Sequence, residues 1–434
     1  MTSSSSAASA GGRGLSRQDM KTLGLSALGG ALEFYDFIVF VFFTQALGQL
    51  FFSPDQSAFA KQLQVYGLFA AAYLARPLGG IVMAHFGDLA GRKRMFTLSI
   101  FLMAVPTFLM GLLPTYADIG LLAPLLMLVL RIVQGAAVGG EVPGAWVFVA
   151  EHVPSRHVGF ACGTLTAGLT AGILLGSLVA TLINAVLTPE QVLAWGWRAA
   201  FVLGGVFGLL GVYLRGYLRE TPVFEAMRER KALSAELPVK RVITAHPGPV
   251  VLSMLLTAAI VVVILMTPSI LQSQYGFTAM AALEANTVAV VCLTIGCVAA
   301  GAAVDRYGPG RTFVAGSVVL AATVYGLYAH IATDPGLLVP AYALAGLAVG
   351  VVGAVPYVMV RAFPPDVRFS GLSFSYNIAY AVFGGLTPLA VAAALERSRE
   401  APAWYVMATC LIGVAAGIFM LVTGYASAPV EGTG

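Results

Sequence analysis

The fold of this chain is decided by a short polar stretch, GDLAGRKR at residues 87–94, which separates two long apolar segments. The carboxylate of Asp88 and the three cations at residues 92–94 would cost too much free energy in hydrocarbon. The stretch therefore predicts a loop in water between two membrane spans. Because basic loops face the cytoplasm in membrane proteins, we expect this loop on the cytoplasmic side.

A related stretch, GAAVDRYGPGR, recurs at residues 301–311. In both stretches an aspartate is followed three residues later by glycine and then by cations. Asp88 and Asp305 lie 217 residues apart (305 − 88), which is half of the 434-residue chain. The repeat predicts two homologous halves.

The composition points to a membrane protein with many spans. Hydrophobic residues make up 59% of the chain, charged residues only 10%, and the mean hydropathy is +0.87, so the charges are too few to cover a soluble globule. The net charge of +4 collects in the predicted inner loops, which indicates topology rather than nucleic-acid binding. The four cysteines lie in apolar segments and the five histidines near span ends or in loops, without metal-ligand spacing, so no metal or cofactor is predicted.

Twelve apolar segments are long enough to cross a bilayer as helices, since about 20 residues span the hydrocarbon. Their even number places both termini on the cytoplasmic side. We therefore predict an all-α integral membrane protein of twelve transmembrane helices in two six-helix halves, in an inner membrane that is expected to be bacterial. The predicted spans are 22–50, 62–86, 95–113, 120–150, 158–187, 196–217, 249–273, 279–303, 312–331, 336–360, 369–395 and 402–425.

The domain organisation follows from these spans. A disordered cytoplasmic tail (1–21) precedes the first half (22–217), a cytoplasmic linker (218–248) joins it to the second half (249–425), and a short cytoplasmic tail (426–434) follows. Residues 222–237 of the linker predict either an amphipathic helix on the membrane surface or a solvated tether. Prolines inside the spans predict bends, because proline lacks a backbone N–H: Pro77, Pro106, Pro143, Pro268, Pro356 and Pro388.

Four ionisable residues fall near the middle of predicted spans: Glu33, Asp36, Arg76 and Arg131. A charge there costs at least about 2.5 kcal/mol on insertion scales, so each should face the bundle interior. Glu33 and Asp36 share one helix face. The first interpretation is that they mark a transport pathway. The simpler one is that Asp36 and Arg131 form a structural salt bridge.

These residues suggest two roles. Asp36, assisted by Glu33, is predicted to carry a coupling proton, with Arg131 beside it controlling its charge. Glu141, in a glycine-rich stretch after Arg131, either titrates with them or anchors a gate. Arg131 is predicted to bind a substrate carboxylate through its planar fork, and Arg76 to make a second contact.

The remaining substrate contacts are predicted from polar groups inside the spans. The first half supplies the Tyr35 hydroxyl and Gln134. The second half has no central charge, and its best polar groups are Tyr376, Asn377 and Tyr380. Charge recognition is therefore expected in the first half, with neutral hydrogen-bonding groups opposite. Gly168, Gly172 and Gly176 form a small-residue ridge that predicts tight helix packing.

Taken together, the motifs resemble the major facilitator superfamily, and within it the metabolite:proton symporter family, whose members carry ketoglutarate, citrate, shikimate, or proline and betaine. The matching pieces run over nearly the whole chain: LEFYDF (32–37), RPLGG (76–80), GDLAGRKR (87–94), Arg131, QG (134–135), GGE (139–141), WGWR (195–198), RETPVF (219–224), FP (363–364), VR (367–368) and YN (376–377).

The resemblance implies a cytoplasmic gate. Asp88, with Arg92 and Glu151, would hold the gate closed in the outward-facing state, and Lys93 lies beside them. The repeat adds Asp305, Arg306 and Arg311. Because several weak pairs can bias two nearly equal conformations, Asp88→Asn is expected to slow turnover without changing specificity.

The predicted function is secondary active transport: proton-coupled symport of a small organic anion, a mono-, di- or tricarboxylate, by a monomer in the lipid bilayer that alternates access. The alternatives are proton-coupled uptake of a zwitterion such as betaine or proline, and a passive channel. An ATP-driven pump is disfavoured because no Gly-Lys pair occurs. No enzyme activity is predicted, since no nucleophile or metal ligands converge.

Overall fold

The computed structural model describes residues 14–90, 92–215, 242, 244, 247–255, 261–364 and 367–425, with side chains described except at 84–97, 214–215, 254–255 and 261. These residues are helical and contain no β-strand. Among the described residues, ten helices are long and apolar enough to cross a membrane, and two shorter apolar helices lie at 98–112 and 262–274. Each of the twelve predicted spans coincides with one of these helices. The linker helix proposed for residues 222–237 lies outside the described residues.

The first half consists of six spans, three of them made of two helices or segments. Its elements are α1 (Arg17–Phe42) with α2 (Thr44–Phe51), α3 (Ala58–Ala90), α4 (Arg92–Leu112), short α5 (Tyr116–Ile119), α6 (Leu122–Val138) with α7 (Glu141–His152), η2 (Ser155–His157), α8 (Val158–Val186), short α9 (Pro189–Gln191), and η3 (Val192–Gly196) with α10 (Trp197–Arg215).

The second half has the same layout, with more interruptions. Its elements are α13 (Pro247–Leu255), η4 (Val261–Met266) and α14 (Thr267–Gln274), then α15 (Ala279–Tyr307), α16 (Pro309–His330), η5 (Pro335–Leu337), α17 (Leu338–Val349), η6 (Gly350–Ala354) and α18 (Val355–Ala362), then α19 (Arg368–Ala379), η7 (Tyr380–Gly385) and α20 (Leu386–Leu395), and last α21 (Ala401–Thr423).

Four of the interruptions in the described helices fall where the sequence places proline. Pro268 and Pro356 are each the second residue of a new α-helix, and Pro143 and Pro388 are each the third. A proline there removes one intrahelical hydrogen bond and leaves carbonyls of the preceding turn unpaired, so that turn adopts π- or 3₁₀-helical geometry. Pro77 and Pro106 lie inside α3 and α4, which continue through them.

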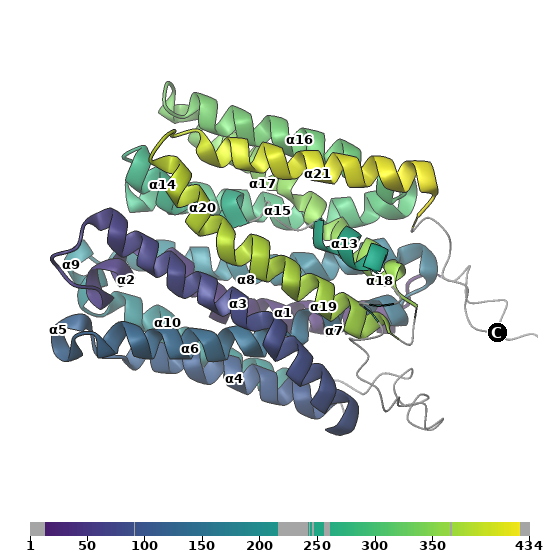
Figure 1. Ribbon diagram of the computed structural model, residues 1–434, viewed down its shortest axis with the longest axis horizontal. Coiled ribbons are helices and arrows are strands. Elements are labelled where there is room, and N and C mark those ends of the chain that lie inside the picture. Colours follow the sequence, from purple (N-terminus) through teal and green to yellow (C-terminus); the bar gives the residue numbers. More distant parts are fainter. Residues whose placement is uncertain are drawn as a thin grey trace, which may run out of the picture.

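The two halves meet along two seams, which Figure 1 shows as α8 beside α15 and α3 beside α19 and α20. The first seam is close because both helices carry glycine. A Cβ added to Gly163 would lie 2.9 Å from the Cα of Gly301, so a larger residue would push the helices apart. The predicted ridge on α8 packs against α1, with Gly168 against Ala27 and Gly172 against Ala31.

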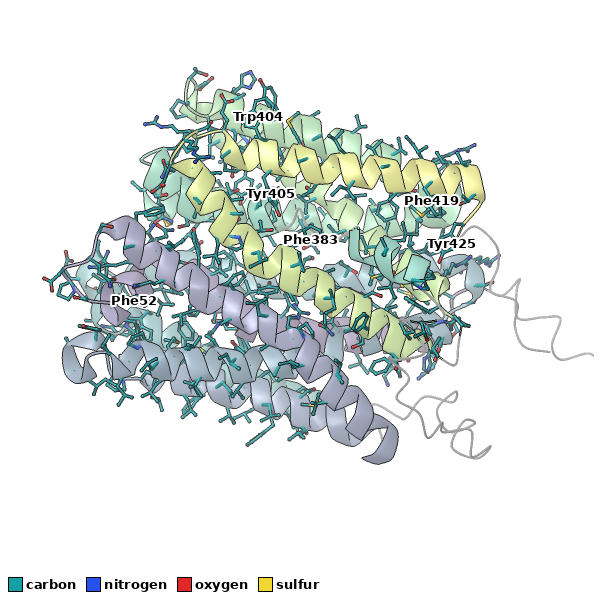
Figure 2. All side chains as sticks on the ribbon, in the orientation of Figure 1. Phe52, Phe383, Trp404, Tyr405, Phe419 and Tyr425 are labelled. Atoms are coloured by element: carbon teal, nitrogen blue, oxygen red, sulfur yellow. The ribbon has the colours of Figure 1, made fainter. Side chains whose placement is uncertain are left out.

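We name the two ends of the bundle by what they hold. At the terminal end, α1 begins and α21 ends, while the opposite, vestibule end holds α2, α5, α9 and the end of α14 (Figure 1). Figure 2 shows Trp404 and Tyr405 near one end of α21 and Phe419 and Tyr425 near the other. Aromatic residues at both ends are typical of a helix that runs between two membrane interfaces.

Candidate functional site

Arg76 lies fully buried where the two halves meet. Its guanidinium carbon is 4.6 Å from the ring centre of Tyr380, 5.2 Å from Tyr376, 5.4 Å from Tyr73 and 6.0 Å from Phe37. None of its three side-chain nitrogens makes a hydrogen bond to the described part of the chain. A buried cation is thus held by ring faces alone, with its donors available to an anion.

Arg131, on α6, lies close to the same group of rings. Its guanidinium carbon is 4.4 Å from the ring centre of Phe40 and 4.8 Å from that of Phe37, and the side chain is fully buried. One nitrogen, Nη1, donates to the Phe37 carbonyl (3.3 Å) and to Gln134 Oε1. Because Phe37 contacts both arginines, the two predicted anion ligands share one aromatic layer.

Gln134 connects Arg131 to the helix that carries the buried carboxylates. Its Nε2 donates to the backbone carbonyl of Asp36 (2.9 Å) and to Thr107 Oγ1 (2.7 Å), while its Oε1 accepts from Arg131. The amide is fully buried and hydrogen-bonded at both ends. The structure therefore places Gln134 between α1, α4 and α6 as a positioning residue, not at the predicted substrate contact.

Asp36 does not pair with Arg131, so the salt bridge that the sequence left as the simpler interpretation is absent among the described residues. Its carboxylate faces α4 and α10, where Cβ atoms added to Gly204 and Gly208 would lie 3.0 Å and 2.5 Å from its oxygens. Neither oxygen has a hydrogen-bond partner among the described residues. The cause is helix geometry: Arg131 contacts the Phe37 side of α1, and consecutive residues point about 100° apart.

Glu33 and Glu141 are buried in the same half as Asp36, with exposed fractions of 5% and 2%. Ser99 donates to Glu141 Oε2 at 3.5 Å, which places that carboxylate beside α4 rather than in a gate. Glu141 also acts electrostatically on Asp36. Three buried carboxylates and two buried guanidiniums therefore lie in the described core of the first half.

Tyr35 was predicted to contact substrate, but its hydroxyl is bonded within the first half. It donates to the Ala200 carbonyl of α10 at 2.9 Å, and its ring packs edge-on against Phe207 at 5.1 Å. Tyr35 thus fixes α10 onto α1 within the first half. It is removed from the set of candidate substrate contacts.

The second half presents its predicted polar groups to the interface. Tyr376 and Tyr380 are the two rings from this half that face Arg76. Asn377 is buried and donates across the interface to the Gly139 carbonyl, to which Ser373 also donates at 3.4 Å. These contacts fit because residue 80 is glycine: a Cβ there would lie 2.7 Å from Asn377 Nδ2.

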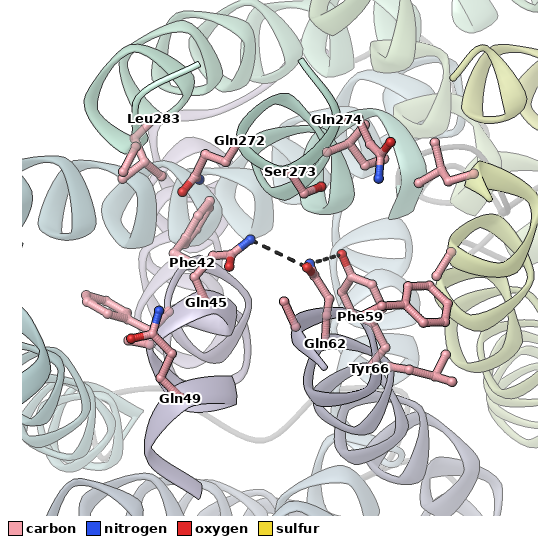
Figure 3. A pocket seen from close by; sticks show the side chains of 18 of the residues that line it. Phe42, Gln45, Gln49, Phe59, Gln62, Tyr66, Gln272, Ser273, Gln274 and Leu283 are labelled. Carbon is pink, nitrogen blue, oxygen red and sulfur yellow. Dashed lines mark hydrogen bonds between the residues drawn. The ribbon is translucent and has the colours of Figure 1, made fainter. Parts of the chain in front are cut away.

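A vestibule of about 770 Å³ opens at the other end of the interface (Figure 3). Amide side chains from both halves line it, with one carboxylate and no cation among the described lining residues. The amides are Gln45, Gln49, Gln62, Asn184, Gln272 and Gln274, and the carboxylate is Glu396.

Gln62 closes the floor of this vestibule. Its Nε2 donates to Ser269 Oγ on α14 of the second half. It also donates to the Tyr66 hydroxyl at 2.9 Å, as Figure 3 shows. Tyr66 also lines a small cavity with Phe40 and Phe69, two of the rings that contact Arg131. Tyr66 therefore lines both the vestibule and this small cavity, which lies beside the rings that surround Arg131.

The terminal end is closed by charged groups. Arg368 Nη1 lies 3.4 Å from Glu151 Oε1, pairing α19 of the second half with α7 of the first. Asp305 accepts from the backbone N–H groups of Gly159 (2.8 Å) and Phe160 (2.7 Å) at the start of α8. Negative charge is favourable at a helix N-terminus, which explains why a carboxylate lies there.

The structure places some of the residues predicted for the gate. Glu151 pairs with Arg368, a partner that the sequence analysis did not assign to the gate, and Asp305 acts as a cap. Arg306 and Arg311 are exposed, and neither makes an ion pair within the described residues. The side chains of Asp88, Arg92 and Lys93 lie outside the described part of the chain.

Sequence reasoning also missed Tyr73 and Gln62. Tyr73 lies three residues before Arg76 and thus on the same helix face, a signal that periodicity alone could have supplied. Gln62 and Ser269 carry no such signal, because each is a single neutral polar residue near a predicted span end.

Comparison with known proteins decides the family. The Major Facilitator Superfamily profile matches residues 26–388, most of the chain. The chain belongs to this superfamily. It is therefore a secondary transporter rather than an enzyme, as the motifs predicted.

Curated relatives and solved structures agree with this assignment. The chain is 33% identical to the glycine betaine/proline/ectoine/pipecolic acid transporter OusA of Dickeya dadantii and 31% identical to the proline/betaine transporter of Salmonella typhimurium, each over 95% of this chain and 85% of the relative. Its fold matches the proton:xylose symporter XylE bound to 6-bromo-6-deoxy-D-glucose, with a TM-score of 0.74 and 19% identity over 93% and 95% of the two chains. The predicted fold is confirmed.

Proposed function

We propose that this superfamily transporter takes up a small zwitterionic solute of the betaine or proline type together with protons. The solute enters through the vestibule, binds at Arg76 and Arg131 between the halves, and leaves at the terminal end. The proposed substrate is therefore the zwitterion that the sequence analysis gave as its alternative, and not the small organic anion that it favoured.

The observation that carries the proposal is the Arg76 guanidinium, buried at the interface with three nitrogens that have no hydrogen-bond partner in the described structure. A buried cation without a partner is costly, and a carboxylate accepts two parallel N–H bonds from a guanidinium. Arg131 Nε and Nη2 are likewise without partners among the described residues. The substrate must therefore carry a carboxylate.

The balance of buried charge favours a zwitterion over an organic acid. With every group ionised, the three carboxylates and two guanidiniums of the first half leave one net negative charge. A zwitterion adds none, so one proton makes the loaded site neutral. A di- or tricarboxylate would leave two or more negative charges in a low-dielectric interior unless further protons were bound.

Two further observations support the same substrate class. The vestibule is lined by neutral amides and one carboxylate, Glu396, which repels anions but admits a solute of zero net charge. The relatives described above are named as betaine and proline transporters. The name of a relative does not establish the substrate of this chain, so uptake has to be measured.

The proposed coupling uses residues of the first half only. Asp36, with Glu33 and Glu141 nearby, takes the proton, because burial disfavours a charged carboxylate. A shift of the Asp36 backbone on protonation reaches Arg131 through Gln134, which donates to the Asp36 carbonyl and accepts from Arg131. Proton and solute then bind to one rigid body, and the halves rock only when the net charge is neutralised.

The proposed orientation places the terminal end in the cytoplasm of a bacterial cell. Basic residues gather there, among them Arg17, Arg156 and Arg361, and cytoplasmic loops are the basic ones in multi-pass membrane proteins. The vestibule would then face outward, so the closed terminal end and hollow opposite end correspond to an outward-facing conformation.

Uptake measurements test the proposal directly. Cells that lack betaine and proline uptake are given this chain, and accumulation of labelled glycine betaine, proline, citrate and ketoglutarate is followed with and without an uncoupler. Saturable uptake of betaine or proline that the uncoupler abolishes is the expected result. Uptake of the carboxylates alone would overturn the substrate, and uptake that neither saturates nor responds to the uncoupler would indicate a channel.

A further inference from the structure

An aromatic box surrounds Arg76, formed by Tyr73 of the first half and Tyr376 and Tyr380 of the second. Tyr73 and Tyr380 stack almost parallel, with ring centres 5.6 Å apart and planes 7° from parallel. Tyr376 lies 4.4 Å from Tyr380, and all three ring centres lie within 5.4 Å of the guanidinium carbon. Ring faces on several sides of one point form a binding site for a cation.

The backbone of the second half is shaped to allow this arrangement. Tyr380 begins the π-helical segment η7, and one turn later Gly384 faces Tyr73. A Cβ added to Gly384 would lie 2.6 Å from the Tyr73 ring. Glycine here lets the Tyr73 ring lie flat against Tyr380, so the box depends on Gly384 as well as on the three tyrosines.

The cation inside the box belongs to the protein itself. The Arg76 guanidinium makes no hydrogen bond to the described chain, and the ring faces are the groups that stabilise it. Hydrogen-bond donors without acceptors are a poor final state for a buried arginine. The guanidinium is thus held where another cation would fit better, one that has no N–H to satisfy.

We propose that Tyr73, Tyr376 and Tyr380 form a subsite for a quaternary ammonium group, which Arg76 occupies until a solute arrives. This rests on the proposed zwitterionic substrate. The carboxylate of the solute draws Arg76 out of the box into a bidentate pair, and the methylated ammonium replaces the guanidinium against the rings. A fully methylated nitrogen donates no hydrogen bond, so ring faces recognise it at no cost in unpaired donors.

The division of the box between the halves links this subsite to transport. Tyr73 belongs to the first half, while Tyr376 and Tyr380 belong to the second, and the three rings are already together in this conformation. A cation bound among them therefore holds the two halves together at this point, and a quaternary ammonium does so more strongly than a primary ammonium. Selectivity and occlusion then arise from the same rings.

A methylation series tests this on the unmodified protein. Glycine, N-methylglycine, N,N-dimethylglycine and glycine betaine share one carboxylate and differ only in the number of N-methyl groups. Each is used to compete against labelled betaine uptake. We expect the inhibition constant to fall with each methyl group, by about tenfold or more over the whole series.

Variants then assign the effect to the box. Tyr380→Leu should weaken betaine by about 2- to 30-fold and flatten the series, while Tyr380→Phe should retain it, because the ring face and not the hydroxyl binds the cation. Tyr325→Leu is the matched control, since Tyr325 is 41% exposed and its ring contact among the described residues is edge-to-face with Trp404, with ring centres 5.9 Å apart. It should leave the series unchanged.

The outcomes separate this proposal from the broader one. If no zwitterion competes and carboxylates do, the proposed function fails. If betaine and proline are taken up but glycine competes as well as betaine, only the aromatic subsite fails. A Tyr380→Leu variant in which all four compounds lose affinity equally would also overturn the subsite. That result would mean that the Tyr380 ring supports the structure and does not recognise methyl groups.

Discussion

The two halves of the molecule contribute different chemistry to one interface. The first half holds five buried charged residues of the described core: Glu33, Asp36, Arg76, Arg131 and Glu141. The second half faces them with Tyr376, Tyr380, Asn377 and Ser373, all without formal charge. Among the described residues, the ion pair between the halves, Glu151–Arg368, lies at the terminal end, as do the contacts that Asp305 and Arg361 make with backbone groups of the first half.

This difference indicates how the cost of the transport cycle is kept low. Separating two buried charges costs several kcal/mol, whereas a neutral hydrogen bond contributes about 0.5–1.5 kcal/mol net. Because the buried charges remain together in one half, rocking breaks mainly neutral contacts and ring contacts at the centre. The second half can then move without separating a buried ion pair.

The sharpest test of this division is Asp36→Asn in the first half. An amide cannot take up or release the coupling proton, so we expect accumulation against a gradient to fall at least about 100-fold, to equilibrium. Exchange of labelled for unlabelled solute should persist, because the solute contacts are elsewhere. Uptake and exchange are measured in the same membrane vesicles.

Asp118→Asn is the matched control, because Asp118 is an exposed carboxylate that accepts from Thr115 at the start of α5. Thr115 lowers the pKa of Asp118 through these hydrogen bonds, so it stays ionised at neutral pH and has no proton to carry. Full accumulation in Asp36→Asn at every pH would remove the proton role from this residue.

The second effect in size is expected for Arg131→Lys. Lysine keeps the charge but loses the planar fork, the bond to the Phe37 carbonyl and the stacking on Phe40. We expect the apparent affinity for solute to fall about 10- to 100-fold while expression is retained. Arg198→Lys is the control, since Arg198 donates to the Gly111 and Leu113 carbonyls away from the interface. An unchanged KM in Arg131→Lys would exclude carboxylate binding there.

The sequence predicted the architecture but not which residues face each other. Apolar length determined the twelve spans, and the cost of charge in hydrocarbon identified Asp36, Arg76 and Arg131 as interior residues. Their partners depend on how each helix is rotated about its axis. That rotation is set by close contacts such as Gly208 against Asp36 and Gly163 against Gly301, which no single-sequence pattern gives.

The gate shows the same limit. Glu151 was expected to pair with residues of the 87–94 loop, because the predicted topology places both at the same end of the bundle. In the described structure it pairs with Arg368, 217 residues away and in the other half, at the symmetric position of the repeat. A charged residue near the end of a span predicts that an ion pair forms there. Its partner depends on which helices of the two halves meet at that end.

A moderate effect is expected for Arg368→Gln at the terminal end. The pair with Glu151 is only slightly exposed, so its loss should shift the balance between closed and open terminal ends by about tenfold. The shift is measured as labelling of a cysteine placed near the terminal end of the interface. Exchanging the charges, Glu151→Arg with Arg368→Glu, should restore the original labelling, and failure to do so would mean that the pair does not hold the end closed.

The smallest effect is expected at the vestibule floor, where the halves meet through a neutral bond. Gln62 donates to Ser269 across the interface and to Tyr66 within its own half. A neutral hydrogen bond contributes about 0.5–1.5 kcal/mol, so Ser269→Ala, which removes only the bond across the interface, should change the rate of exchange about 2- to 10-fold and leave selectivity intact. Gln62→Ala also removes the bond to Tyr66 and should give at least as large a change, and adding Ser269→Ala to it should have no further effect, because the bond between the halves is already lost. Strictly additive effects would show that the two side chains act independently.

The ranking of the two ends can be tested in the same measurements. We propose that an ion pair holds the terminal end closed more strongly than a neutral amide holds the vestibule end, which the solute has to open. An effect of Gln62→Ala larger than that of Arg368→Gln would reverse this ranking.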